Sequence, residues 1–222
     1  MDLVVRSVRR AAPGREALLD AASVLMDVHG IDHVSLNEIN RVSGNRNRSA
    51  VSYHFGSRDA IVRALVARDM TTVDGERRAA LDDLERLGTP ITPRTALEVA
   101  IGPLARRLET EPGRRYLRLC GQLTNHPRYV ADLGDLLSVN DGMIRTAAYV
   151  APLVAHLPER LAAERVRQSI GFTVRALADQ AALVDLPDPP RPPLALPEFT
   201  GNLADLVEAM LSADTSQVDE QR

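Results

Sequence analysis

The sequence predicts an all-α protein, with an N-terminal helix-turn-helix unit followed by a larger helical part. Three observations lead to this prediction. Only 3% of the 222 residues are aromatic and none is Trp, so the core must be built from aliphatic side chains, which suits helix-on-helix packing. Apolar residues recur at helical spacing along most of the chain. Residues 35–60 combine two helix starts with a tight turn.

The chain begins with a short arm, residues 1–14, that carries three arginines and no apolar periodicity. Such an arm is typical of a disordered chain end, and the alternative is a segment that contacts phosphates or enters a minor groove. The first helix is expected over residues 15–29, where Leu18, Ala22 and Leu25 share one face and Gly30 provides the end.

The next two helices form the predicted helix-turn-helix. Ser35, with Glu38 three residues later, has the pattern of a capping box that opens a short helix over residues 36–42. A Ser-Gly pair ends this helix. Val51 and Phe55 lie four residues apart, so they can pin a further helix onto it.

Polar side chains occupy the opposite face and the N-terminal edge of that further helix. Arginine can pair bidentately with guanine and asparagine with adenine in the major groove. The candidate contacts to a double-stranded DNA operator on this helix are Arg46, Asn47, Arg48, Ser49, Ser52 and Tyr53. Ser35 and the backbone amides beside it, at a helix N-terminus, can bind a phosphate.

The charge distribution agrees with this interpretation. Residues 1–68 hold 10 Arg against 7 acidic residues, a net charge of +3, whereas the remainder holds 17 against 23, a net charge of −6. Positive potential is therefore concentrated where phosphate would be neutralised. Chance variation is the alternative explanation of this asymmetry.

The run Tyr53-His54-Phe55, followed by Ser57-Arg58-Asp59-Ala60, resembles the DNA-binding domain of TetR-family transcriptional regulators over residues 15–68. The resemblance implies phosphate contacts for Tyr53, His54 and Arg58. The chain departs from the commonest family pattern in two ways. Asn45 to Tyr53 is one residue longer, and Ser52 stands where many members have a second tyrosine.

The remaining helices are expected to follow a long connector. Ser57 can cap a helix that continues to Leu87-Gly88 and joins the two parts rigidly. Further helices are expected over residues 93–108, over 114–124, from His126-Pro127 to Tyr149, over 160–186 and over 199–210, with a Pro-rich spacer at 186–197. The predicted organisation is an arm at 1–14, a DNA-binding domain at 15–68, an effector-binding and dimerisation domain at 69–211, and a disordered tail at 212–222.

The last two expected helices carry an apolar stripe that requires a partner helix. In the TetR family such a pair forms a four-helix bundle across a twofold axis, so the resemblance implies a homodimer. Packing within one chain is the alternative. The candidate interface residues are Val166, Ile170, Thr173, Leu177, Ala181, Val184, Leu203, Leu206 and Met210.

The resemblance also implies a small-molecule pocket between the middle helices, and a repressor that the ligand releases from a palindromic operator. The candidate ligand residues mix apolar bulk with polar groups: they are Arg118, Asn125, His126, Tyr129, Met143, Tyr149 and Phe172. The effector itself is not identified by the sequence. The alternative is an effector-free DNA-binding dimer controlled by its abundance or by a protein partner.

The sequence contains no motif for an enzyme nucleophile, a metal centre or a phosphate-binding loop, so neither catalysis nor a metal or other cofactor is expected. The single cysteine, Cys120, fits a reducing compartment, and a buried thiol is favoured over a redox sensor. With neither a signal-like N-terminus nor a long apolar run, a cytoplasmic protein without membrane partners is expected.

Overall fold

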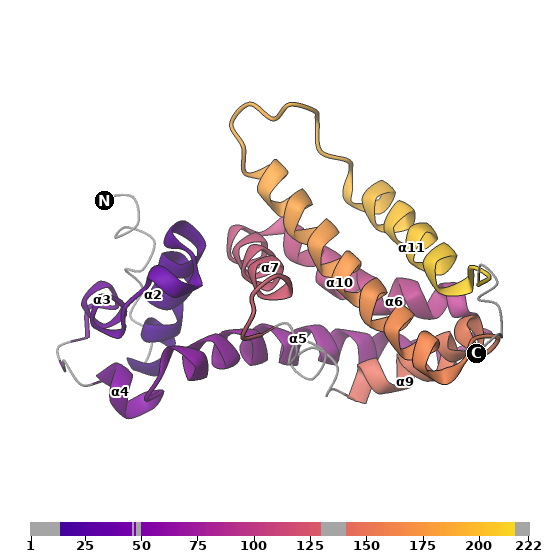
Figure 1. Cartoon of the computed structure of the whole chain (residues 1–222), viewed down its shortest axis with the longest axis horizontal. Helices are drawn as coiled ribbons and strands as arrows, with labels where there is room; N and C mark the ends of the chain where they lie inside the picture. Colours follow the sequence, from indigo (N-terminus) through magenta and orange to yellow (C-terminus); the bar gives the residue numbers. More distant parts are fainter. Residues whose placement is uncertain (1–13, 46, 48–49, 130–140, 216–222) are drawn as a thin grey trace, which may run out of the picture.

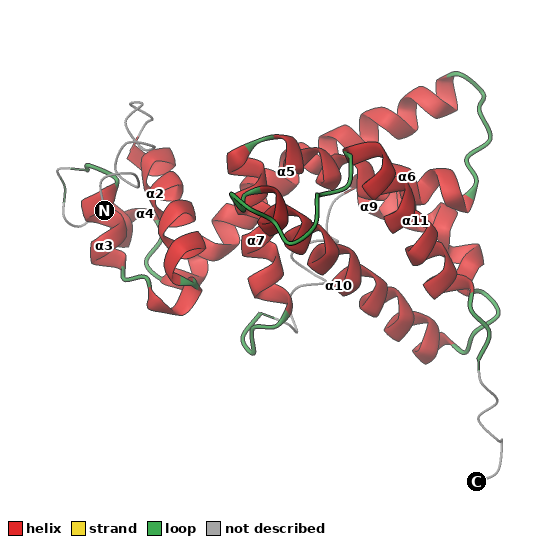
Figure 2. Cartoon of the chain, turned by 90° about the horizontal axis from the view of Figure 1, so that it is seen from above, coloured by secondary structure: helices red, strands yellow, loops and turns green. Residues whose placement is uncertain are grey.

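A computed structural model describes residues 14–45, 47, 50–129 and 141–215, and every regular element within these ranges is helical. Figure 1 shows a small group of helices at one end, made of α2 (Gly14–His29), α3 (Leu36–Val42) and α4 (Ala50–His54), with the 3-10 turn η1 (Ile31–His33) between α2 and α3. The all-α prediction is confirmed for the described residues, and Figure 2 shows helices joined only by loops.

Local signals in the sequence set the ends of these first helices. The Ser35 hydroxyl accepts a hydrogen bond from the Glu38 amide at 3.1 Å, as the capping box predicts. Gly30 and Gly44 have positive φ angles of 83° and 69°, which glycine adopts without steric cost. Ser57 caps α5 (Arg58–Arg86) by accepting from the Ala60 amide at 3.1 Å.

The long helix α5 connects the N-terminal group to the rest of the chain, as Figure 1 shows. The remaining elements are α6 (Pro93–Ala105), the 3-10 turn η2 (Arg106–Glu109), α7 (Glu111–Thr124), α9 (Asp141–Val150), the 3-10 turn η3 (Ala151–Val154), α10 (Glu159–Val184) and α11 (Leu196–Ser212). One apolar core runs from α2 through α5 into α6, α7, α10 and α11. The apolar core is therefore continuous between the two ends of the molecule.

Helix α7 occupies a central place in this arrangement, because it packs against α2 on one side and α10 on the other. A Cβ atom on Gly121 would lie only 2.5 Å from the Ala178 Cβ, so glycine is needed where α7 meets α10. Helices α10 and α11 lie side by side and are linked by the loop at residues 185–195 (Figure 1).

Two expected boundaries were wrong. Pro112 and Gly113 lie inside the first turn of α7, where a missing proline amide costs no helical hydrogen bond, and Thr110 caps that turn. His126 does not open a helix, because residues 126–129 form a turn and α9 begins only at Asp141. The expected arm and most of the expected tail, at 1–13 and 216–222, lie outside the described residues.

No helix in the described part of the chain combines the length and the apolar character that a membrane span requires.

Candidate nucleic-acid interface and effector cavity

The turn between α3 and α4 orients the candidate DNA-binding face. Val51 is 1% exposed and lies in the core, and the half-buried ring of Phe55 packs against the same core. The Arg15 guanidinium lies 5.2 Å from the centre of the Phe55 ring, in cation–π geometry. The two apolar anchors therefore fix α4 with its other face toward solvent.

Three predicted contact residues project from that outer face. Ser52, Tyr53 and His54 are all exposed, and Tyr53 is 83% exposed. The Tyr53 and His54 rings meet edge to face, with 5.2 Å between their centres. A large exposed aromatic ring beside a histidine and a hydroxyl is a surface suited to packing on a sugar-phosphate backbone.

Two further predicted contacts are also exposed, one at the start of α3 and one in the turn that follows it. Ser35 is exposed at the N-terminus of α3, and Asn47 is exposed between α3 and α4. The Asn47 amide donates to the Asn45 Oδ1 at 3.2 Å, which shapes the turn. Arg46, Arg48 and Ser49 lie outside the described residues.

Arg58 has an additional role that the sequence did not indicate. Its Nε donates to the Val34 carbonyl at 3.0 Å, and one terminal nitrogen lies 3.4 Å from an Asp32 carboxylate oxygen. Arg58 therefore ties the start of α5 to the η1 segment, and its side chain remains about one third exposed. The proposed phosphate contact has to be made by a guanidinium that is already engaged.

A cavity of about 230 Å³ lies at the other end of α5, between α5, α6, α9, α10 and α11. Its walls are mainly aliphatic side chains, among them Leu97, Ile101, Leu104, Val150, Val154 and Ile170. Asp74 seats α9 beside the cavity, because its carboxylate accepts hydrogen bonds from the Gly142 and Met143 amides at 3.2 and 3.1 Å. A space of this size and lining suits a small, largely apolar molecule.

The buried polar side chains of the cavity wall include Arg77 and Ser169, beside Thr146 and Thr173. Arg77 is 2% exposed and donates to the Ala100 carbonyl at 3.0 Å and to the Met70 sulfur at 3.7 Å. Burial lowers the pKa of Arg77, against an opposing effect of Asp74. Ser169 is 3% exposed, and its hydroxyl has no hydrogen-bond partner among the described residues.

Only one of the seven predicted ligand residues, Met143, lines this cavity. The Tyr149 hydroxyl instead donates to Glu85 at 3.3 Å on the outside of α5. Phe172 is 37% exposed on α10. These two positions do not meet the cavity, so they are removed from the candidate ligand site.

The other four predicted ligand residues lie on α7 or just after it, on the side that faces the N-terminal helices. Arg118 forms a bidentate pair with Asp27 of α2, at 2.8 and 2.7 Å, and also pairs with Asp185. Asn125 borders, together with Arg118, a more open groove of about 540 Å³ between α2, α7 and α10. We therefore assign Arg118 and Asn125 to the junction between the two ends of the chain and not to the ligand cavity.

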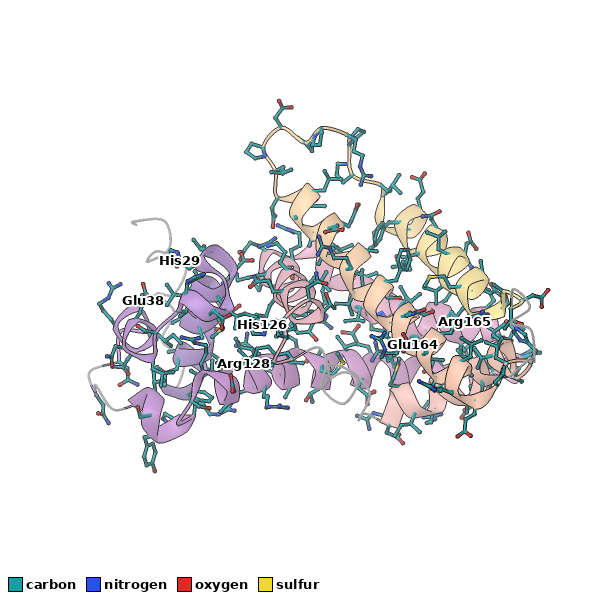
Figure 3. All side chains as sticks on the ribbon, in the orientation of Figure 1. His29, Glu38, His126, Arg128, Glu164 and Arg165 are labelled. Atoms are coloured by element: carbon teal, nitrogen blue, oxygen red, sulfur yellow. The ribbon has the colours of Figure 1, made fainter. Side chains whose placement is uncertain are left out.

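His126 and Tyr129 complete this junction. The His126 Nε2 lies 2.9 Å from an Asp32 carboxylate oxygen, and the Tyr129 hydroxyl donates to Asp59 at 2.6 Å. Figure 3 shows His126 and the neighbouring Arg128 between the N-terminal helices and α7. We call the contacts of Arg118, Gln122, His126 and Tyr129 with α2, η1 and α5 the junction latch.

Gln122 supplies the uncharged part of the junction latch. Its side-chain oxygen accepts from the Ile31 amide at 3.2 Å, and its side-chain nitrogen donates to the Met26 carbonyl at 3.3 Å. The Ile31 amide at the start of η1 thereby gains an acceptor, and the Met26 carbonyl, which already accepts from the Gly30 amide at 3.0 Å, gains a second donor. Through this one side chain, α7 is hydrogen-bonded to the C-terminal end of α2 and to η1.

Electrostatics in the latch follow from these pairs. A hydrogen bond to His126 lowers the pKa of Asp32, and the charges of Arg58 and Arg128 act in the same direction. Burial, followed by the Asp59 carboxylate, raises the pKa of Tyr129 to about 12. Near neutral pH, Tyr129 is therefore a neutral donor.

The predicted dimer-interface residues divide into three groups. Leu177, Ala181 and Leu203 are at most 2% exposed inside the single chain, so they cannot form an outer surface. Val166, Ile170 and Thr173 line the cavity. Val184 and Leu206 remain exposed, at 38% and 44%, and Met210 is half-buried. The helical spacing was correct, but much of the stripe packs within the chain.

Cys120 lies in the core and is 2% exposed. Burial raises the pKa of its thiol to about 12, and the Tyr116 side chain contacts it. The thiolate that oxidants attack is therefore not formed at neutral pH. This position agrees with the buried thiol that the sequence favoured.

Sequence reasoning missed the polar residues that are most distinctive in the structure. Arg77 falls on the buried stripe of α5 between Val73 and Leu81, and Ser169 falls between Val166 and Thr173 on α10. A charged or hydroxyl residue inside an apolar helical stripe is the signal that would have indicated both. Among the described residues, no group of three His, Cys, Asp or Glu side chains is arranged to hold a metal ion.

Comparison with solved structures finds a similarity to a TetR-family regulator from Streptomyces coelicolor A3. The alignment covers 92% of this chain and 99% of that chain, with 16% sequence identity and a TM-score of 0.44. No protein-family model matches the sequence, and a search of curated proteins finds no match.

Proposed function

We propose that this chain is a dimeric, sequence-specific DNA-binding transcriptional regulator, and that a small molecule in the α5–α11 cavity lowers its affinity for a palindromic operator. The observation that carries the proposal is the orientation of α4. Val51 and Phe55 hold one face in the core, and Ser52, Tyr53 and His54 present the opposite face to solvent beside the exposed N-terminus of α3.

The sequence motif and the charge distribution support the same function. Tyr53 and His54 belong to the run that resembles TetR-family regulators, and residues 1–68 carry the net positive charge. A palindrome is read by two recognition helices about 34–36 Å apart, which requires a dimer. The proposed dimer surface is the outward face of α10 and α11, where Phe172 and Leu206 are exposed.

The cavity favours a ligand-responsive regulator over an effector-free dimer. An effector-free protein needs no internal space, yet this cavity has about 230 Å³ of volume and an unpartnered serine hydroxyl in its wall. In this proposal the operator-bound protein represses transcription until the ligand releases it.

The test begins with selection of duplexes from a random pool by the full-length protein. We expect a palindromic consensus, bound with an affinity that falls steeply as salt increases. Failure to enrich any sequence would contradict sequence-specific binding.

Tyr53→Ala is the variant that checks the contact surface. Because the ring is 83% exposed, its removal should change the unfolding free energy by less than about 0.5 kcal/mol. We expect operator affinity to fall about tenfold, with a similar loss on non-specific duplexes, since a phosphate contact carries no sequence information. Fluorescence anisotropy measures both affinities. Leu87→Ala is the matched control, because Leu87 is an exposed apolar residue at the C-terminal end of α5 and belongs to neither α4 nor the proposed dimer surface. Equal operator affinities for the two variants would remove Tyr53 from the interface.

A further inference from the structure

The cavity wall contains a charged group that makes no direct ion pair among the described residues, and the nearby charge of Asp74 offsets its burial only in part. The Arg77 guanidinium donates only to an uncharged carbonyl and a thioether, and no carboxylate among the described residues pairs with it. Asp74, one turn earlier on α5, is committed to the two amides at the start of α9 and lies 3.5 Å from Arg78. A buried cation without a directly bonded anion is costly, so an anion delivered into the cavity would be stabilised.

A second group in the same wall also lacks a partner. The Ser169 hydroxyl is buried and makes no hydrogen bond to the described residues, whereas the hydroxyls of Thr146 and Thr173 donate to carbonyls of their own helices at 2.6 and 2.8 Å. Leaving a buried hydroxyl unbonded costs free energy unless a ligand completes it. The polar side chains of the wall therefore fall into two kinds. The two threonine hydroxyls are hydrogen-bonded, whereas among the described residues Ser169 has no hydrogen-bond partner and Arg77 has no ion-pair partner.

The rest of the wall sets the shape and polarity of that ligand. It is formed mainly by aliphatic side chains from five helices, including Leu97, Leu104 and Val207, which border a space of about 230 Å³. An apolar cavity of about 150 Å³ admits benzene, so this space accommodates an apolar body somewhat larger than one ring. A polyanion such as a nucleotide would have too few polar partners here.

We infer that the effector is an apolar monocarboxylate, whose carboxylate pairs with Arg77 and one of whose oxygens accepts a hydrogen bond from Ser169. This inference rests on the proposal that the cavity is the effector site. It specifies the ligand by one negative charge on a compact aliphatic or aryl-alkyl body. Arg77 fixes the charged end, and the aliphatic wall excludes water from the remainder.

Isothermal titration calorimetry on the full chain tests the inference with two acids, decanoate and 4-phenylbutyrate, and their isosteric primary amides. At least one acid should bind ten or more times tighter than its amide. Arg77→Met should abolish that preference and leave the affinity for the amide unchanged. Arg78→Met, a half-exposed neighbour on α5 outside the cavity wall, should keep the wild-type preference.

Ser169→Ala separates ligand binding from folding. It removes an unpartnered hydroxyl, so the unliganded variant should melt at the wild-type temperature or higher, yet bind the preferred acid several times more weakly. No binding of either acid, equal binding of acids and amides, or an acid preference that survives Arg77→Met would each overturn the inference.

Operator DNA separates this inference from the proposed function. If the acids bind as expected but no duplex is enriched, the regulator proposal fails and the ligand class stands. If an operator is bound but no acid is, the ligand class fails and the regulator proposal stands.

Discussion

A single phenol hydroxyl joins the segment after α7 to the first turn of α5. Tyr129 is 2% exposed, and its hydroxyl donates to the Asp59 carboxylate at 2.6 Å. The carboxylate lies near the N-terminus of α5, where the helix dipole also favours negative charge. This hydrogen bond therefore adds to the other latch contacts between the two ends of the molecule, and it depends on a proton that alkaline pH removes.

We expect Tyr129→Phe to lower the unfolding free energy by about 1–2 kcal/mol at pH 7, because the Asp59 carboxylate loses a buried donor. The pKa of Tyr129 is raised from its ordinary value near 10 to about 12 in the folded chain. The neutral phenol therefore stabilises the fold below pH 10, and this contribution is lost as the pH rises from about 10 to about 12. Urea unfolding of both proteins at several pH values measures the difference.

The matched control for this substitution is Tyr149→Phe, which removes a hydroxyl that contacts Glu85 at 3.3 Å outside the latch. It should change the unfolding free energy by less than about 0.5 kcal/mol at pH 7. A Tyr129→Phe deficit of the same size at pH 7 and at pH 11 would show that the hydrogen bond to Asp59 is not its cause.

At the scale of elements, helix α10 has three faces with different surroundings. Leu177 and Ala181 pack into the core, Ile170 and Ser169 line the cavity, and Phe172 points outward. Leu161 and Phe172 lie eleven residues apart, close to three helical turns, so they share the outward face. This face, with Leu206 of α11, is the apolar surface that the proposed dimer would bury.

The double substitution Phe172→Asp and Leu206→Asp should give a folded monomer. Both positions are at least 37% exposed in the single chain, so the charges are tolerated there, whereas burial in a dimer would leave them unpaired at a cost of several kcal/mol. Sedimentation velocity measures the mass, and far-UV circular dichroism measures the helix content.

Leu177→Asp is the informative contrast, because this fully buried residue should unfold the chain rather than separate two copies. If the outer-face variant remains a dimer, the interface lies on another surface.

These elements show how far the sequence could predict the molecule. The Ser35 and Ser57 caps and the glycine ends of α2, α3 and α5 were predictable because each depends on residues within one turn. The position of Arg118 and Tyr129 was not, because nothing local indicates that this side of α7 meets α2 and not the cavity. The stripe on α10 was predicted correctly as an apolar face, but periodicity does not distinguish packing within a chain from packing between chains.

At the scale of the whole molecule, two connections link the cavity to the DNA-binding face. The first is α5, which carries Asp59 and Arg58 near α4 and Arg77 in the cavity wall. The second passes from α10 to α7 and through the junction latch to α2, since α7 packs against both helices. Ligand-dependent movement of α10 would therefore reach α2 through α7 and the latch, as well as through rotation of α5.

This arrangement predicts that the latch transmits the coupling between effector and operator. In the wild type, a bound acid should weaken operator binding, and the operator should weaken acid binding by the same factor, typically 5–150-fold for a coupling of about 1–3 kcal/mol. Arg118→Met removes the bidentate pair with Asp27, so it should reduce this factor while the affinity for the acid alone stays near wild type. Arg114→Met is the matched control, because Arg114 lies one turn earlier on α7 and also pairs with Asp185 but makes no bond to α2 among the described residues. Calorimetry with and without a saturating operator duplex gives the factor for each protein. If both variants keep the full coupling, the signal travels along α5 alone, and the latch serves only to hold the two ends together.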